Sequence, residues 1–144
     1  MLTTNTYLNF KNNCEAAFQF YKSVFGGEFI HVGRFGEMPE NENYKVPDSD
    51  KNKIMHISLQ IGQSVLMGSD CGSAYEAGFI QGNNFSISVN ADSKEDADRY
   101  YAGLSNGGAA TMPMNQTFWG SYFGMLTDPF GVSWMISFDQ HATK

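Results

Sequence analysis

The chain has 144 residues, of which 42% are hydrophobic and 15% aromatic, and this predicts a single domain over residues 1–144 with one hydrophobic core. Nine Lys and Arg against 15 Asp and Glu give a formal charge of −6, and the scattered bases argue against a nucleic-acid partner. Apolar runs are too short to span a bilayer and no secretory leader opens the sequence, so we expect a cytoplasmic protein with no membrane partner.

The first half of the chain contains one clear helix pattern among several strand patterns. From Asn13 apolar residues recur at helical spacing, with Asn12 or Asn13 as the N-cap and Gly26-Gly27 as the stop. The other segments have strand or loop patterns: a strand at 4–10, a strand at 28–35, a loop at 36–52, and a hairpin of strands at 53–61 and 64–68. This half predicts a strand, a helix and three further strands.

The same order of patterns returns after residues 71–82, a predicted linker rich in glycine and small polar side chains. Ser93 is the predicted N-cap of a second helix that ends at about residue 106. Strand patterns surround this helix, at 84–89, 109–112, 121–127 and 132–138. The sequence therefore predicts an α+β fold of paired βαβββ modules, at about 1–70 and about 83–139, related by duplication.

Three segments, FYKSVFGG, HISLQIGQSVLMGSD and DPFGVSW, resemble the vicinal oxygen chelate superfamily, which includes glyoxalase I, bleomycin-resistance proteins and extradiol dioxygenases. YLNFKNNCEAAFQFYKSVFGGEF followed by MHISLQIGQSVLMGSD is most similar to its PhnB-like branch, whose members have carried a demethylubiquinone methyltransferase label. No GxGxxG follows a strand here, so we do not predict methyl transfer. The resemblance implies a mixed, curved sheet that forms a cup, and a homodimer.

The resemblance also implies where a metal would be held, because relatives take ligands from the first and last strands of each module. Those positions fall on Thr6, Met67, Asn84 and Met135. Metal-dependent relatives use His and Glu, whereas a hydroxyl, thioethers and a carboxamide are poor ligands for Zn²⁺, Ni²⁺, Mn²⁺ or Fe²⁺. We therefore expect no metal and no other cofactor, with a divalent ion as the disfavoured alternative.

A small-molecule ligand is the expected partner, and His56 is the best candidate for a polar contact with it. His31 could face either side of its strand, and His141 lies in the C-terminal tail. The predicted pocket combines polar and aromatic or thioether side chains: Tyr7, His56, Met67, Asn84, Trp119, Tyr122 and Met135. The alternatives are that His56 only bonds to a backbone group and that the apolar members are ordinary core.

Other reactive side chains have simpler explanations. Cys14 stands at a helix N-terminus, which can activate a thiol, but no partner base is evident and a structural role is preferred, as it is for Cys71. We expect both thiols to be reduced. Asp128 in Asp-Pro-Phe-Gly is assigned to a turn, since aspartate bonds its own backbone there.

The leading hypothesis is a metal-free protein that binds a small hydrophobic or aromatic compound, drug sequestration of the bleomycin-resistance kind being one version. The rival hypothesis is a glyoxalase-like lyase or isomerase, or a dioxygenase-related enzyme, with a non-standard site around His56. In that enzyme His56 would be a displaced metal ligand or a general base. A structural or regulatory protein without a ligand is the third possibility.

Overall fold

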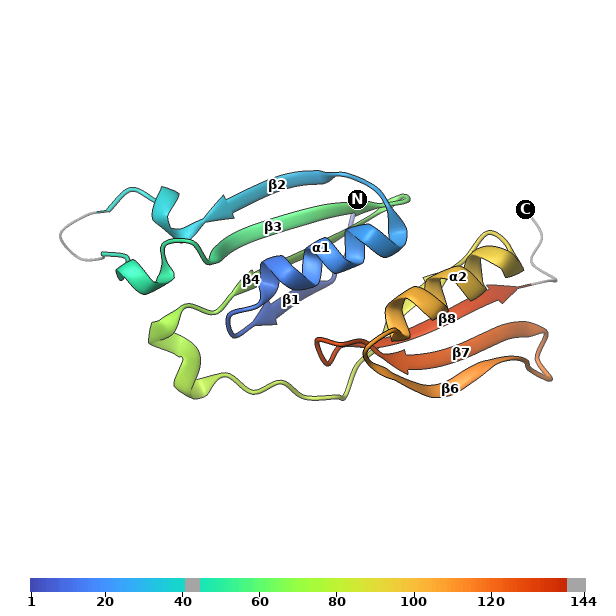
Figure 1. Cartoon of the computed structure of the whole chain (residues 1–144). Coiled ribbons are helices and arrows are strands. Elements are labelled where there is room, and N and C mark those ends of the chain that lie inside the picture. The colour runs from blue at the N-terminus through green and yellow to red at the C-terminus, as the bar shows by residue number, and fades with distance from the viewer. Residues whose placement is uncertain (41–44, 140–144) are drawn as a thin grey trace. The chain divides into compact units, whose positions relative to one another are not determined.

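The computed structural model describes residues 1–40 and 45–139, so His141 lies outside the described residues. The chain divides into two compact units, Met1–Gln81 and Gly82–Lys144, and each contains one four-stranded mixed sheet and one long helix (Figure 1). The boundary between the units falls in the glycine-rich segment at 71–82. No helix among the described residues is long and apolar enough to cross a membrane.

The first unit has the strand order β1-β4-β3-β2, with β1 parallel to β4 and the other neighbours antiparallel. Its main elements are β1 (Tyr7–Phe10), α1 (Cys14–Phe25), β2 (Phe29–Arg34), β3 (Ile54–Ile61) and β4 (Ser64–Asp70). Short 3₁₀ helices lie outside the sheet, at Phe35–Glu37 (η1), Asp48–Asp50 (η2) and Ser73–Gly78 (η3).

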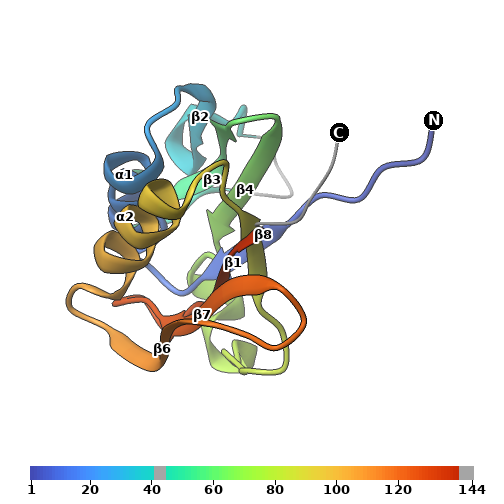
Figure 2. The ribbon, with the colours of Figure 1, turned by 90° about the vertical axis from the view of Figure 1, so that its right-hand side faces the viewer.

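The second unit repeats this topology with the order β5-β8-β7-β6, again with the first and last strands parallel. Its elements are β5 (Ile87–Asn90), α2 (Lys94–Ser105), β6 (Ala109–Gln116), β7 (Ser121–Thr127) and β8 (Ser133–Asp139). The predicted α+β fold of paired βαβββ modules is confirmed. In each unit the helix lies along one face of its own sheet (Figure 2).

Helix α1 forms where the apolar pattern predicts it. Its buried residues are Cys14, Ala17, Phe18 and Tyr21, a spacing that puts all four on the side facing β3 and β4. Gly26, with φ +76°, ends the helix in a conformation that residues with a side chain rarely adopt.

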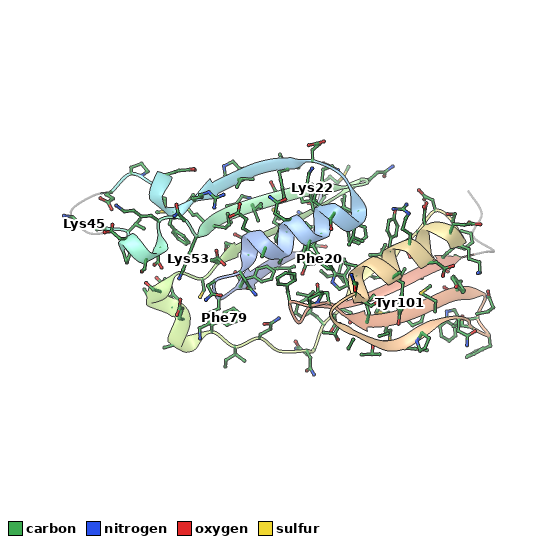
Figure 3. All side chains as sticks on the ribbon, in the orientation of Figure 1. Phe20, Lys22, Lys45, Lys53, Phe79 and Tyr101 are labelled. Atoms are coloured by element: carbon green, nitrogen blue, oxygen red, sulfur yellow. The ribbon has the colours of Figure 1, made fainter. Side chains whose placement is uncertain are left out.

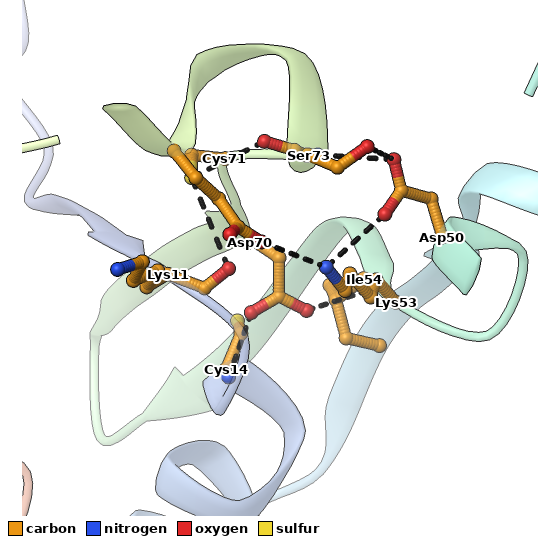
Figure 4. A network of polar contacts seen from close by, with 10 residues as sticks. Lys11, Cys14, Asp50, Lys53, Ile54, Asp70, Cys71 and Ser73 are labelled. Atoms are coloured by element: carbon orange, nitrogen blue, oxygen red, sulfur yellow. Dashed lines mark hydrogen bonds and ion pairs between the residues drawn. The ribbon is translucent and has the colours of Figure 1, made fainter. Parts of the chain in front are cut away.

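The two helices begin in different ways. Asn13 occupies the N-cap of α1, but its side chain makes no capping bond; instead the Cys14 amide donates to Asp70 Oδ1 at 3.0 Å. The other oxygen of Asp70 accepts from the Ile54 amide at 2.8 Å, as Figure 4 shows. In α2 the cap is the predicted one, because Ser93 Oγ accepts from the Asp96 amide at 3.0 Å. Asp70 thus replaces a local cap with a contact from β4.

Helix α2 is also tied to its sheet by a polar contact. Tyr101, labelled in Figure 3, donates its hydroxyl to the carbonyl oxygens of Met112 at 2.9 Å and Met125 at 3.0 Å. The helix buries Ala97 and Leu104 against the strands. One tyrosine therefore joins α2 to both β6 and β7.

Three strand boundaries differ from the predictions by three residues or more. β1 begins at Tyr7 and β5 at Ile87, each three residues later than their patterns predict, because pairing with β4 and β8 starts only there. β6 continues to Gln116, past Pro113, where the prediction stopped at Met112. β6 is an edge strand with two register shifts, and an edge can accommodate a residue that lacks an N–H.

Candidate functional site

The two faces of the first sheet are unequal. Leu66, Gly68 and Asp70 on β4 are buried on the side that carries α1. A Cβ at Gly68 would lie 2.8 Å from Phe18 Cε1, so the helix packs closely at that point. Because side chains alternate along a strand, Met67 projects from the opposite face, which we call the open face because α1 lies on the other side of the sheet.

A row of side chains crosses this open face from edge to edge. The register pairs Tyr7 on β1 with Met67 on β4, Met67 with Ser58 on β3, and Ser58 with His31 on β2. Paired residues of neighbouring strands project from the same face. We call these four residues the Met67 row.

His56 lies on the same face, two residues before Ser58 on β3. Its ring centroid is 5.7 Å from that of Tyr7 and 5.4 Å from that of His31. The Tyr7 hydroxyl and His56 Nδ1 are 3.4 Å apart, a long hydrogen bond in which the tautomer decides which group donates. A Cβ at Gly33 would lie 2.9 Å from His31 Cε1, so this glycine leaves room for the ring.

Of the predicted pocket residues, the structure therefore brings Tyr7, His56 and Met67 together. His31 and Ser58 join them, and sequence reasoning did not select either. The sequence does not show which residues of β2 face which side of the sheet, because the strand has a register shift between Phe29 and His31. Alternation along β2 alone cannot place His31 on one face.

In the second unit, Met135 belongs to a different row. The register joins Ser88 on β5, Met135 on β8, Met125 on β7 and Met112 on β6, which we call the Met135 row. Phe123 is two residues before Met125, and its ring lies 6.2 Å from that of Trp119. Trp119 itself is 59% exposed in the β6–β7 connection and also contacts Phe118, with ring centroids 5.0 Å apart. The methionines and these rings are apolar, but the register also places the polar side chains of Asn90, Ser137 and Asn115 on this face.

Tyr122 lies on the other face of the second sheet. Its hydroxyl donates to Asp98 Oδ1 at 2.6 Å, and Lys94 Nζ is 4.5 Å from its ring centroid, so it contacts α2. The hydrogen bond to Asp98 raises the pKa of Tyr122. Alternation explains the placement, since Gly124 and Leu126 on the same strand are buried there. Tyr122 does not share the face of Met135.

The remaining predicted positions can also be located. Asn84 is exposed and precedes β5 by three residues, while Ser88 is the residue paired with Met135. On β1 Tyr7, rather than Thr6, is paired with Met67; Thr6 contributes its carbonyl oxygen, which accepts from the Met67 amide.

These positions provide a test of whether the side chains fit a divalent metal. The residues closest to the expected ligand positions offer a phenol, a hydroxyl and two thioethers. Within the described ranges 1–40 and 45–139, no three residues of the His, Cys, Asp and Glu types cluster so as to hold an ion. A Zn²⁺, Ni²⁺, Mn²⁺ or Fe²⁺ site needs several imidazole, carboxylate or thiolate ligands. Neither Tyr7 and Met67 in the first unit nor Ser88 and Met135 in the second provide such ligands, so these residues do not fit a divalent metal.

The side chains of Cys14 and Asp128 are buried. Cys14 is fully buried, and burial, with a further contribution from the Asp70 charge, raises the pKa of its thiol well above the usual range. Cys14 and Cys71 are both free, as expected. Asp128 Oδ1 accepts from the Phe130 and Val132 amides, which confirms the predicted turn. Its Oδ2 also accepts from Trp134 Nε1 at 2.9 Å, a contact that the turn motif did not reveal.

The buried carboxylate of Asp50 connects the segments around η2 and η3. Asp50 Oδ2 accepts from the amide and the hydroxyl of Ser73, at 3.0 and 2.8 Å (Figure 4). Lys53 Nζ lies 3.1 Å from Asp50 Oδ1 and 3.1 Å from Glu76 Oε2. The pKa of Asp50 is lowered, mainly by the hydrogen bond from the Ser73 amide. The Ser73 hydroxyl and Lys53 lower it further.

Comparison with known proteins identifies the family. Residues 3–137 match the model of the family described as 3-demethylubiquinone-9 3-methyltransferase. Protein YjdN of Escherichia coli strain K12 is 32% identical over 140 residues, which cover 91% of each chain.

Solved structures agree with this assignment. Protein PA1353 from Pseudomonas aeruginosa is 42% identical with a TM-score of 0.82, over 96% of this chain and 98% of that one. A putative 3-demethylubiquinone-9 3-methyltransferase, the PhnB protein of Bacillus cereus, is 25% identical with a TM-score of 0.74, over 95% and 99%. A glyoxalase/bleomycin resistance protein/dioxygenase family enzyme from Burkholderia phytofirmans PsJN shares the fold, with 21% identity and a TM-score of 0.63 over 94% and 99%. The chain therefore belongs to the PhnB-like, 3-demethylubiquinone-9 3-methyltransferase family, and its fold is that of the glyoxalase/bleomycin-resistance proteins.

Proposed function

We propose that this protein binds a small, planar hydrophobic or aromatic molecule on the open face of the first sheet, without a divalent metal. The observation that carries the proposal is the ring cluster of Tyr7, His31 and His56, with centroids 5.4 and 5.7 Å apart. Such rings offer flat apolar surface and polar edges to a planar ligand. Met67 in the same row adds a thioether that can adapt to an irregular shape.

The donor chemistry supports the metal-free part of the proposal. Two imidazoles, a phenol and a thioether can bind an organic molecule by stacking and hydrogen bonds. They lack the carboxylate that balances the charge of the ion in metal-dependent relatives.

A fluorescent neutral aromatic, N-phenyl-1-naphthylamine, tests the proposal with protein dialysed against EDTA. We expect the fluorescence of this compound to rise when it binds. The substitutions Tyr7→Ala and His56→Ala should each lower its binding affinity several-fold. Tyr75→Ala is the matched control, because Tyr75 is 74% exposed on η3. Elemental analysis that finds one stoichiometric divalent ion per chain, with binding lost on its removal, would contradict the proposal.

Catalysis at the same cluster is the second candidate, favoured by the 3.4 Å contact between the Tyr7 hydroxyl and His56 Nδ1. In the tautomer whose Nδ1–H donates to the phenol oxygen, His56 Nε2 keeps a lone pair and can act as a general base. Proton abstraction from a carbon acid is the simplest reaction for this pair. Exchange of the acidic C–H of a 1,3-diketone into D2O, followed by NMR, should then be accelerated by the protein and lost in His56→Gln. Binding without accelerated exchange would reject catalysis of this reaction.

A homodimer is proposed from the family resemblance. Sedimentation equilibrium should give about twice the 16.0 kDa chain mass. A monomer at all concentrations would exclude a stable dimer without affecting the binding proposal.

A further inference from the structure

The ionic character of the first sheet limits which ligands it can accept. Strands β1 to β4 contain one carboxylate, Asp70, and it is buried on the helix-bearing face, where it accepts from the Cys14 and Ile54 amides. Their one guanidinium, Arg34, is held by both carboxylate oxygens of Glu15 at 2.8 and 2.9 Å. The open face therefore presents no fixed anion of these strands to a ligand.

The polar groups around the ring cluster can all donate hydrogen bonds. These groups are the Tyr7 hydroxyl, the imidazoles of His31 and His56, and the side chains of the paired residues Asn9 and Ser69. The Ser58 hydroxyl lies on the same face but is buried. An imidazole also gains a positive charge when it takes up a proton, which an anion beside it favours. A cation would find neither a carboxylate nor a fixed negative charge on these strands.

We propose that this face selects planar molecules that carry an acidic oxygen, ionised as a carboxylate, phenolate or enolate. The ring system would lie against the imidazole and phenol rings, and the anionic oxygen would accept from Tyr7, His31 or His56. Charge-assisted hydrogen bonds of this kind are stronger than those between neutral groups. This inference rests on the proposed function and specifies its ligand class.

Three naphthalenes of similar size test the effect of ligand charge at nearly constant shape: the anion 2-naphthoate, the neutral 2-naphthamide and the cation of 2-(aminomethyl)naphthalene. Isothermal titration of the full chain should give an affinity for the naphthoate roughly tenfold above that for the amide, with the ammonium compound weakest. Tyr7→Phe, His31→Asn and His56→Asn should each reduce this preference. Lys45→Gln removes an exposed cation elsewhere in the first unit and should leave the preference unchanged.

The outcomes distinguish the two proposals. Equal affinity for all three compounds, or tighter binding of the ammonium compound, overturns the ionic selection and leaves the binding of planar molecules intact. Binding of none of them overturns both. A naphthoate preference that persists in the three variants places the anion elsewhere and also overturns the inference, provided that circular dichroism shows each variant folded.

Discussion

The Met67 row and the Met135 row cross equivalent sheets but carry different chemistry. The first contains Tyr7, Ser58 and His31, and its neighbour on β3 is His56; the second contains Ser88 and three methionines, with Phe123 as the neighbour on β7. The strand order and the parallel pairing are the same in both units. The fold is thus the same in both units, whereas the two rows differ: the first offers mainly hydrogen-bonding groups and the second mainly thioethers.

The two units also differ at the N-termini of their helices. In the first, a buried carboxylate 56 residues along the chain accepts from the amide of the first residue of α1. In the second, a serine next to α2 accepts from the amide of Asp96, the third residue of that helix. A local cap depends on little else, but Asp70 joins α1, β3 and β4 in one contact. We therefore expect the stability of the first unit to depend strongly on Asp70, and that of the second unit to depend less on Ser93.

The largest effect is expected for Asp70→Ala. It removes two hydrogen bonds to a buried carboxylate and leaves the Cys14 and Ile54 amides unsatisfied, at a cost of about 4 kcal/mol in the free energy of unfolding. Chemical denaturation measures the loss, and amide hydrogen exchange should quicken in α1 and β3 but not in α2. Asp48→Ala, at a largely exposed side chain, is the control and should change stability by less than about 0.5 kcal/mol.

Exchanging residues between the rows is expected to have the next largest effect. His56→Phe together with His31→Met gives the first sheet the residue types found at Phe123 and Met112. Affinity for 2-naphthoate should fall about tenfold, with little change for 2-naphthamide, because only the anion loses charge-assisted bonds. Calorimetric titration gives both values; an unchanged ratio would show that the difference between the rows has no part in ligand choice.

Ser93→Ala should have a smaller effect than Asp70→Ala. It removes the bond from the Asp96 amide and should lower stability by about 1 kcal/mol, since the helix end remains accessible to water. Hydrogen exchange in the first turn of α2 is the readout. A loss as large as that of Asp70→Ala would remove the distinction between a local and a non-local cap.

Acid should weaken the first unit through Asp50, with the smallest effect of the four. Its pKa is lowered in the folded protein, so its stabilisation is present above the unfolded-state pKa and is lost as the pH falls through the folded-state value. The net contribution is below about 1 kcal/mol, because burial of the carboxylate raises its pKa and offsets part of the lowering by the Ser73 bonds. Denaturation curves at pH 7 and in strong acid should show a smaller difference for Asp50→Asn than for the natural chain. An equal difference would assign the acid sensitivity to other groups.

Much of the fold is readable from the sequence because its signals are local. The helical spacing of apolar residues between Asn13 and Gly26-Gly27 is enough to place α1, and Ser93 marks the start of α2. Boundaries set by pairing are less visible: β6 passes through Pro113 because it is an edge strand. Asp70 could not be found as the partner of α1, because nothing near Cys14 indicates it.

The candidate site is only partly readable for the same reason. Tyr7 follows from strand alternation, while His56 and Met67 follow from the family resemblance and, for Met67, the repeat. The register joins all three on one face. His31 depends on a bulge in β2 that shifts its phase. Tyr122 and Phe123 are neighbours on one strand, and only contact with α2 shows that Tyr122 belongs to the helix side.

The central claim is that a planar ligand binds at the Met67 row. Its most direct test is NMR of protein labelled in the methionine methyl groups and the histidine rings, titrated with 2-naphthoate. We predict that the Met67 methyl and the His31 and His56 ring resonances shift together and saturate with one affinity. Saturable binding that leaves these three residues unmoved, with shifts only at residues such as Met112 and Met125, would contradict the claim.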